Sequence, residues 1–262
     1  MSDIPLFFDS HAHLTSKALS NQADTLADRS WSAGVRHVIN ICTDRDSLEK
    51  GLLLAQRHPW ILNAGATTPH DVDKEGEELF PIFAEQARNG SLVAVGETGL
   101  DYFYEHSDRE IQKTFLRRYL ALAVECDLPV VIHCREAFQD LFDILDSDYC
   151  DNGKHRPGVL HCFTGTIQEA EQVIQRGWYL SLSGIVTFKK SEELRQVARM
   201  VPLDHLLIET DAPYLAPQSH RGKTNEPSYV PETAQVIADV KGLTITEVAK
   251  ATWHNASTLF RL

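Results

Sequence analysis

The chain has 262 residues, of which 43% are hydrophobic, and this length can bury one large core or two smaller ones. No run approaches the ~20 consecutive apolar residues that a membrane-spanning helix needs. The formal net charge of −12 argues against broad electrostatic attachment to nucleic acid or to an anionic membrane. Carboxylates that hold divalent cations count as negative in that sum, so the total charge does not exclude a phosphate-bearing substrate.

The compartment is predicted from the N-terminus and the cysteines. Residues 1–5 contain neither a basic segment nor a long apolar run, so we expect no secretory signal peptide. The five cysteines lack the spacing of a disulfide framework and suit a reducing compartment. We therefore expect a cytoplasmic protein that does not associate with membranes, and we favour a monomer.

Short apolar runs alternate with longer segments of helical periodicity along the whole chain. The predicted strands are residues 6–9, 35–42, 60–66, 92–97, 129–134, 158–162, 178–183 and 205–211. The predicted helices are residues 22–33, 47–57, 77–89, 109–126, 138–146, 167–176, 192–200 and 231–241. Near-continuous apolar strands are typical of a parallel sheet that is covered on both faces. The pattern predicts an α/β fold, a single-domain (β/α)8 TIM barrel over residues 1–262, with a doubly wound open sheet as the alternative.

Metal-competent side chains occur at the ends of several predicted strands. His11 and His13 follow the first apolar run and, because side chains alternate along a strand, they share one side. Such a pair alone is weak evidence, since histidine is often simply hydrogen-bonded. The full set is His11, His13, Glu97, His133, His161 and Asp211. In a barrel the carboxyl ends of all strands converge on one face, so we expect these residues to form one site.

The number of candidate ligands predicts two divalent metal ions. One catalytic zinc ion takes about three protein ligands and a water, and this chain offers six candidates. We expect Glu97 to bridge the ions, with His11, His13 and Asp211 on one and His133 and His161 on the other. Two ions about 3.5–4 Å apart can stabilise both oxygens of a phosphoryl displacement. The metal stays open among magnesium, manganese and zinc.

Three further residues lie next to these ligands in the sequence. Cys134 and Cys162 each follow a proposed ligand, and strand alternation predicts that they face the helices as small buried residues. Glu209 shares the face of Asp211. We expect a functional role for Glu209, because an unpaired buried carboxylate is costly. It can support a ligand, hold an extra ion or lie as a charge within the barrel.

The chain resembles the TatD family of metal-dependent deoxyribonucleases over essentially its whole length. The segments that carry the resemblance are FDSHAH at 8–13, GETGLDY at 96–102, HCR at 133–135, HCFTG at 161–165, ETDAPYL at 209–215, RGKTNEP at 221–227 and NASTLF at 255–260. The resemblance implies the barrel, divalent-metal nuclease activity and 3′-to-5′ exonuclease action on DNA, with single-stranded 3′ ends as the expected partner. Family members often carry Gly-x-His-Pro-His after the third strand, where this chain has Thr68 in place of the first histidine and retains His70.

Several residues are predicted to contact the substrate. Arg135 can bind phosphate, with pairing to Asp101 or Asp140 as the alternative. Arg221 and Lys223 can hold the nucleic-acid backbone, and His70 can contact the substrate phosphate or the leaving group. The aromatic residues expected to border the site, where they either stack bases or pack the barrel mouth, are Tyr102, Phe103, Phe163 and Tyr214.

Three functions remain compatible with the sequence. The first is hydrolysis of DNA phosphodiester bonds by a metal-activated water, with Glu97 as the bridge and Asp211 both binding metal and orienting or deprotonating that water. The second keeps the barrel and metals but acts on a small amide, ester or lactone, although binuclear amidohydrolases commonly use a carbamylated lysine where this chain has Glu97. The third is a metal-stabilised binding module without turnover. Whether RNA is also cut stays open.

Overall fold

The computed structural model describes residues 5–104, 106–150 and 155–262, so most of the N-terminal segment examined for a signal peptide lies outside the described residues. Eight strands form one sheet in the order β1 to β8, and each neighbouring pair is parallel. The strands are β1 (Phe7–Ala12), β2 (Val35–Cys42), β3 (Ile61–Gly65), β4 (Ala94–Asp101), β5 (Val130–Arg135), β6 (Val159–Leu160), β7 (Tyr179–Leu182) and β8 (Leu206–Ile208).

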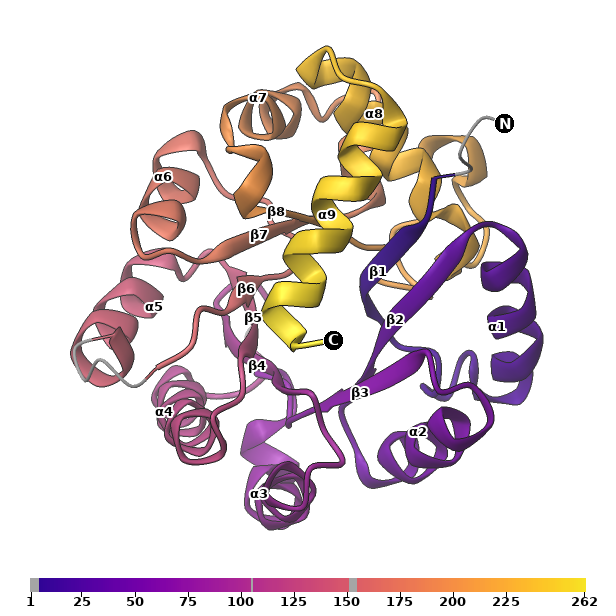
Figure 1. Ribbon diagram of the computed structural model, residues 1–262. Helices are drawn as coiled ribbons and strands as arrows, with labels where there is room; N and C mark the ends of the chain where they lie inside the picture. The colour runs from indigo at the N-terminus through magenta and orange to yellow at the C-terminus, as the bar shows by residue number, and fades with distance from the viewer. Residues whose placement is uncertain (1–4, 105, 151–154) are drawn as a thin grey trace.

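Helices α1 to α8 follow the strands in alternation and surround them, as Figure 1 shows. The helices are α1 (Ala23–Ser32), α2 (Arg45–Arg57), α3 (Val72–Arg88), α4 (Arg109–Cys126), α5 (Phe138–Ile144), α6 (Ile167–Gln175), α7 (Glu192–Met200), α8 (Val230–Lys241) and α9 (Ile245–Phe260). The predicted barrel is confirmed, and an open doubly wound sheet is excluded by this strand order. Among the described residues, no helix is both long and apolar enough to span a bilayer.

The barrel closes between its first and last strands. Asp211 N donates to His11 O at 2.9 Å, and His13 N donates to Ala212 O at 2.7 Å. These bonds join the end of β1 to the segment after β8, where Ala12 and Ala212 form an isolated parallel β-bridge. The closure therefore places Asp211 beside His11 and His13, although positions 11 and 211 are 200 residues apart along the chain.

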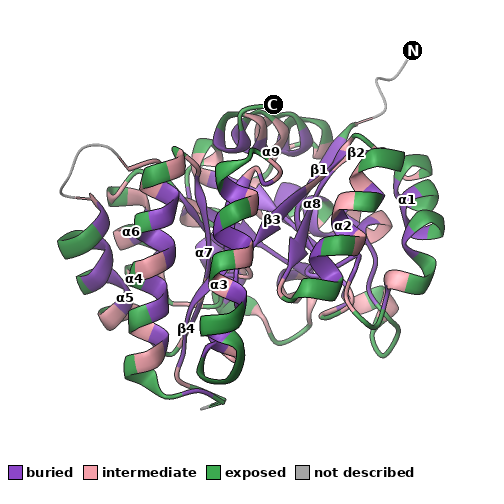
Figure 2. Ribbon diagram, turned by 90° about the horizontal axis from the view of Figure 1, so that it is seen from below, coloured by how far each residue is buried: buried purple, intermediate pink, exposed green. Residues whose placement is uncertain are grey.

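Helix α9 closes the opposite end of the barrel. Its first turn is capped by Thr244, whose hydroxyl accepts from Glu247 N, and Glu247 in turn accepts from Thr244 N. Its buried face packs Leu259 and Phe260 against Phe8 and the apolar side chains inside the barrel. Figures 1 and 2 show α9 lying across the barrel end at which β1 begins. The loops that follow the carboxyl ends of the strands lie at the other end.

Strand β4 differs from its predicted bounds. The apolar run predicted an end at Glu97, and this was wrong, because β4 continues to Asp101. The register with β5 shifts between Gly96 and Thr98, so the pairing is irregular at Glu97, and such irregularities re-aim side chains near active sites. Gly99 allows the close approach of β5, since a Cβ atom there would lie 1.9 Å from the carbonyl oxygen of His133 and its φ is +145°. Glu97 thus lies mid-strand and faces the barrel mouth.

Candidate metal centre

Glu97 lies at the middle of the candidate centre. Its Oε2 atom is 3.4 Å from His11 Nε2 and 3.5 Å from His13 Nε2. Its Oε1 atom is 3.3 Å from His133 Nδ1 and 3.2 Å from His161 Nε2. Each carboxylate oxygen therefore faces a separate pair of imidazoles, which is the arrangement that a carboxylate bridging two cations requires.

Asp211 completes the set around the first pair of histidines. Its Oδ1 atom lies 3.6 Å from His11 Nε2 and 3.4 Å from His13 Nε2, and these two nitrogens are 3.1 Å apart. Ligand atoms around an ion with bonds of 2.0–2.1 Å are separated by roughly 3.0–3.4 Å along the edges of its coordination polyhedron. The distances among these atoms are close to that range, so the residues present fit a divalent cation.

The electrostatics of the centre also favour a cation. Burial opposes ionisation of Glu97, but the surrounding histidines, His161 first among them, outweigh burial and hold the pKa of Glu97 well below its ordinary value. The pKa of Asp211 is lowered in the same way, against its burial, by the hydrogen bond with His13. Two buried, ionised carboxylates attract positive charge, which protonated histidines or metal ions can supply.

Asp101 supports His133 from the side opposite Glu97. Its Oδ2 atom accepts from His133 Nε2 at 2.8 Å, and its Oδ1 atom accepts from the backbone N–H groups of Phe103 and Tyr104. Burial raises the pKa of Asp101, but these hydrogen bonds outweigh it and lower the pKa to about 2. Sequence reasoning considered Asp101 only as a partner for Arg135. Asp101 lies four residues after Glu97 on the same side of β4. A prediction that extended this strand beyond Glu97 would have placed Asp101 near the ligands.

Glu209 lies beside His161 without forming the kind of hydrogen bond that joins Asp101 to His133. It is fully buried, its Oε1 atom lies 3.5 Å from His161 Nδ1, and the same oxygen accepts from Cys162 N at 2.6 Å. His161 therefore has Glu209 on one ring nitrogen and Glu97 on the other. This geometry is compatible with two of the roles left open for Glu209, support of His161 and a ligand in a cation site with His11 and His161.

The two cysteines next to the histidines differ. Cys134 belongs to the buried core, as strand alternation predicted. Cys162 does not follow the alternation, because β6 ends at Leu160 and Cys162 lies beyond it with a φ of +44°. Its Sγ atom is 3.3 Å from Ser183 Oγ, and burial followed by the nearby carboxylates Asp211 and Glu209 raises its pKa. The prediction that Cys162 faces the helices was therefore wrong.

Arg135 forms a stack with two exposed aromatic residues at the barrel mouth. Its guanidinium lies 3.6 Å from the ring centre of Phe103 and 4.7 Å from that of Tyr104. Its predicted alternative partners have other contacts, since Asp101 binds His133 and Asp140 accepts from the hydroxyl of Tyr102. The side chains of Phe103 and Tyr104 are 48% and 50% exposed. The stack leaves the edge of the guanidinium available to a phosphate.

The other predicted aromatic residues have different surroundings. Tyr102 is partly buried, and its ring is covered by Arg109 at 4.3 Å. Phe163 is buried against Phe138, so it packs the barrel mouth. Tyr214 is 57% exposed and lies 5.9 Å from the ring of His13. Tyr214 is therefore the most exposed of these three side chains.

His70 lies beside the second pair of histidines. Its Nε2 atom is 3.8 Å from Asp101 Oδ2, and its ring centre is 5.4 Å from that of His133. The ring of Tyr104 is 5.7 Å away on the solvent side. Burial, with the charge of His133, lowers the pKa of His70. His70 is therefore near enough to the centre to contact a bound substrate.

The loop after β8 carries the remaining predicted residues, Arg221 and Lys223, both of which are exposed. Asn225 fixes this loop, because its side-chain amide donates to Thr210 O at 2.7 Å and to Tyr214 O at 2.6 Å. The side chains of Arg221 and Lys223 are therefore held on the barrel face that contains Asp211, although no contact joins them to the six candidate ligands.

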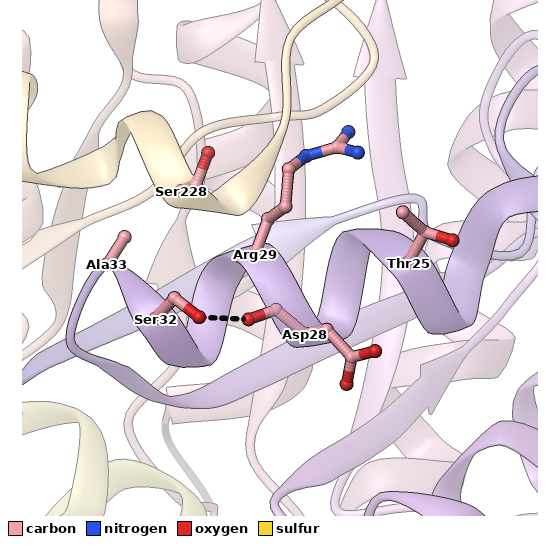
Figure 3. Close-up of a pocket in the computed structure, with 6 residues that line it drawn as sticks. All are labelled: Thr25, Asp28, Arg29, Ser32, Ala33 and Ser228. Atoms are coloured by element: carbon pink, nitrogen blue, oxygen red, sulfur yellow. Dashed lines mark hydrogen bonds between the residues drawn. The ribbon is translucent and has the colours of Figure 1, made fainter.

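A surface depression of about 480 Å³ lies elsewhere, between α1 and the 3-10 helix η7 (Pro227–Tyr229). Its lining residues are Thr25, Asp28, Arg29, Ser32, Ala33 and Ser228 (Figure 3). Arg29 forms an ion pair with Glu226, and Ser32 Oγ donates to Asp28 O. The lining residues do not form a group that could hold a metal ion. The barrel mouth is therefore the better candidate for a metal-dependent site.

The fold and site together define a parallel β/α barrel with a histidine- and carboxylate-lined centre that fits divalent cations. The chain belongs to the TatD related DNase family, whose model matches residues 8–261. It is 36% identical over 257 residues to the uncharacterised metal-dependent hydrolase YabD of Bacillus subtilis, covering 98% of this chain and 100% of that protein. It is 34% identical over 261 residues to the 3′-5′ ssDNA/RNA exonuclease TatD of Erwinia tasmaniensis, covering 97% and 100%. The structure of YJJV, a TatD homologue of Escherichia coli, matches with a TM-score of 0.88 at 29% identity and 99% coverage of both chains. The resemblance inferred from the motifs is confirmed.

Proposed function

We propose that this protein is a divalent-metal-dependent deoxyribonuclease that hydrolyses DNA phosphodiester bonds as a 3′-to-5′ exonuclease on single strands. The observation that carries the proposal is Glu97, whose two oxygens face two separate histidine pairs at 3.2–3.5 Å. A centre for two adjacent cations suits phosphodiester hydrolysis. The names of the relatives support the same chemistry, one being a metal-dependent hydrolase and another a ssDNA/RNA exonuclease.

The residues present divide into two ligand sets that share Glu97. His11, His13 and Asp211 would hold one ion, and His133 and His161 the other. When bound, the two ions would polarise the phosphate and lower the pKa of a coordinated water molecule. Asp211 has a lowered pKa and is therefore ionised at neutral pH, so its carboxylate is available to accept the proton of the attacking water. Asp101 and Glu209 keep the two histidine rings in position.

The substrate contacts follow from the groups around the mouth. Arg135 would bind a phosphate near the scissile bond, and Arg221 and Lys223 would hold the backbone further along the strand. His70 would contact the leaving-group oxygen or the phosphate. The hydroxyl of Tyr102 donates to Asp140 and its ring is covered by Arg109, so Tyr102 would act by packing at the edge of the substrate site.

The test is product analysis with metal-loaded protein. A 5′-labelled single-stranded DNA oligonucleotide is incubated with the protein and magnesium, manganese or zinc, beside a matched RNA and a panel of lactones and amides. We expect stepwise shortening from the 3′ end, release of 5′-mononucleotides and a block by a 3′-terminal phosphorothioate linkage. Turnover of the lactones or amides without release of nucleotides would support the small-substrate alternative, and binding of metal without any turnover would support the binding module.

A further inference from the structure

We propose that two adjacent loops, residues 184–191 after β7 and residues 212–224 after β8, form a clamp for the sugar-phosphate backbone of a single strand of nucleic acid. The clamp would hold the part of the strand that remains after each cleavage. Its cations are Lys189, Lys190, Arg221 and Lys223, of which the first two were not anticipated from the sequence. The inference rests on the nuclease function proposed above.

The two loops form one continuous surface. Gln218 N donates to Thr187 Oγ1 at 2.8 Å, and Lys189 N donates to the side-chain oxygen of Gln218 at 3.3 Å. Their backbones also approach closely, because a Cβ atom added to Gly184 would lie 2.4 Å from the carbonyl oxygen of Leu215. The backbones that carry these cations are therefore held in a fixed relation to one another.

Arg221 and Phe188 form the contact at which the loops meet. The guanidinium of Arg221 lies 4.2 Å from the ring centre of Phe188. Stacking of this kind orients the planar guanidinium while leaving its N–H groups at the edge free to donate to a phosphate. Phe188 thus pre-organises a phosphate-binding group.

The charges of the clamp are available, whereas many cations elsewhere on the surface are neutralised locally. Arg57 pairs with Asp24 and Arg88 pairs with Glu125, for example. Within the described ranges, no carboxylate lies within ion-pair distance of any of the four clamp cations. Two acidic residues close to them in sequence have their own partners, since Glu192 pairs with Arg195 and Glu232 pairs with His220. In a chain with a net charge of −12, such a grouping favours an anionic polymer as the ligand.

The clamp is continuous with the candidate metal centre. Tyr214 N donates to Asp211 O at 2.9 Å, so the loop that carries Arg221 starts directly at a proposed ligand. The exposed ring of Tyr214 lies between Asp211 and the clamp cations Arg221 and Lys223 along the chain, where a base can stack on it. The stack of Arg135, Phe103 and Tyr104 is formed by the last residue of β5 and the loop after β4, and would take the terminal nucleotide.

The test compares the double variant Lys189→Gln/Lys190→Gln with the control Arg199→Gln/Lys250→Gln. The control removes the same charge from two exposed helical residues outside the clamp. Binding of a 12-nucleotide single strand is measured by fluorescence anisotropy in an Asp211→Asn background at several salt concentrations. Each lost phosphate contact lowers affinity about fivefold at ~0.1 M salt, so we expect about 25-fold weaker binding by the clamp variant and a salt slope reduced by about 1.4. Circular dichroism checks that each variant is folded.

Kinetics separate the clamp from the catalytic centre. In the otherwise unaltered protein, the clamp variant is expected to raise KM for the 12-mer while leaving kcat, and KM for a dinucleotide, within twofold of wild type. Unchanged 12-mer binding, or an equal loss on the dinucleotide, would overturn the clamp. If the wild-type protein cleaves neither substrate, the proposed function fails, and the anisotropy measurement still decides whether the clamp binds nucleic acid.

Discussion

Asp101 Oδ2 lies 2.8 Å from His133 Nε2, and the other nitrogen of that ring, Nδ1, lies 3.3 Å from Glu97 Oε1. A neutral imidazole carries one proton. With that proton at Nε2 and donated to Asp101, the lone pair of Nδ1 points into the centre. Asp101 thereby selects the tautomer of His133 that can bind a cation.

Replacing Asp101 should weaken the half of the centre that contains His133. Asp101→Asn can donate to Nε2 instead of accepting from it, which would move the proton to Nδ1. We expect a 10- to 100-fold loss of affinity for the second ion, the magnitude typical of removing a partner that supports a metal ligand. Isothermal titration with manganese or zinc measures it. Asp140→Asn is the control, since Asp140 pairs with Lys113 and Tyr102, and equal affinities in the two variants would contradict the role of Asp101.

Glu97 should determine how many ions the protein holds. Its two oxygens face different histidine pairs, so Glu97→Ala removes a ligand from both positions. We expect two ions per chain in the saturated wild-type protein and at most one in the variant, measured by elemental analysis after removal of free metal. Two tightly held ions in Glu97→Ala would contradict a bridging role.

Asp211 should be needed for turnover more than for folding. Asp211→Asn keeps the size of the side chain but removes its charge and its basicity, so we expect nearly complete loss of nucleotide release with little change in the melting temperature. Single-turnover hydrolysis of a labelled strand and thermal denaturation are the two measurements. Hydrolysis at the wild-type rate would exclude Asp211 as the base.

The metal-free protein should lose stability as the pH rises. Burial opposes protonation of His161, but Glu97 and Glu209 outweigh it and raise its pKa well above 6.5, and the pKa of His133 is also raised. A pKa that is higher in the folded state stabilises that state below the unfolded value, and the stabilisation disappears as the pH passes the folded value. Between pH 6 and 9 the melting temperature of chelated protein should therefore fall. The metal-loaded protein should not show this fall, because bound ions replace the protons. A chelated protein whose melting temperature depends on pH in the same way as that of the metal-loaded protein would contradict the raised pKa of the two histidines.

Gly99→Ala should severely destabilise the barrel. An added Cβ atom would meet the backbone of His133 at 1.9 Å, in a strand pair that cannot separate without moving Glu97 and His133. We expect a loss of more than ~3 kcal/mol in the free energy of unfolding. Gly90→Ala is the matched control, since Gly90 also has a positive φ but no atom within 4 Å of an added Cβ, and it should cost about 1 kcal/mol. Chemical denaturation measures both, and similar losses would contradict a steric requirement at Gly99.

The sequence by itself determined the succession of strands and helices and the six candidate ligands. Apolar runs and helical periodicity are short-range properties that can be read without the fold, as the bounds of β2, α4 and α7 illustrate. The convergence of His11, Glu97 and Asp211 could also be predicted, because parallel strands in a barrel place their carboxyl ends on one face.

Only the tertiary structure decided how these side chains are aimed and supported. The register shift at Glu97 depends on the pairing between β4 and β5, and the contacts of Glu97 with two histidine pairs join four different strands or strand ends. Glu209 meets His161 across 48 residues of chain, and Lys189 meets Gln218 across 29. Register, closure and loop packing arise from contacts between distant segments, so alternation within one strand could not predict the position of Cys162 or the continuation of β4 to Asp101.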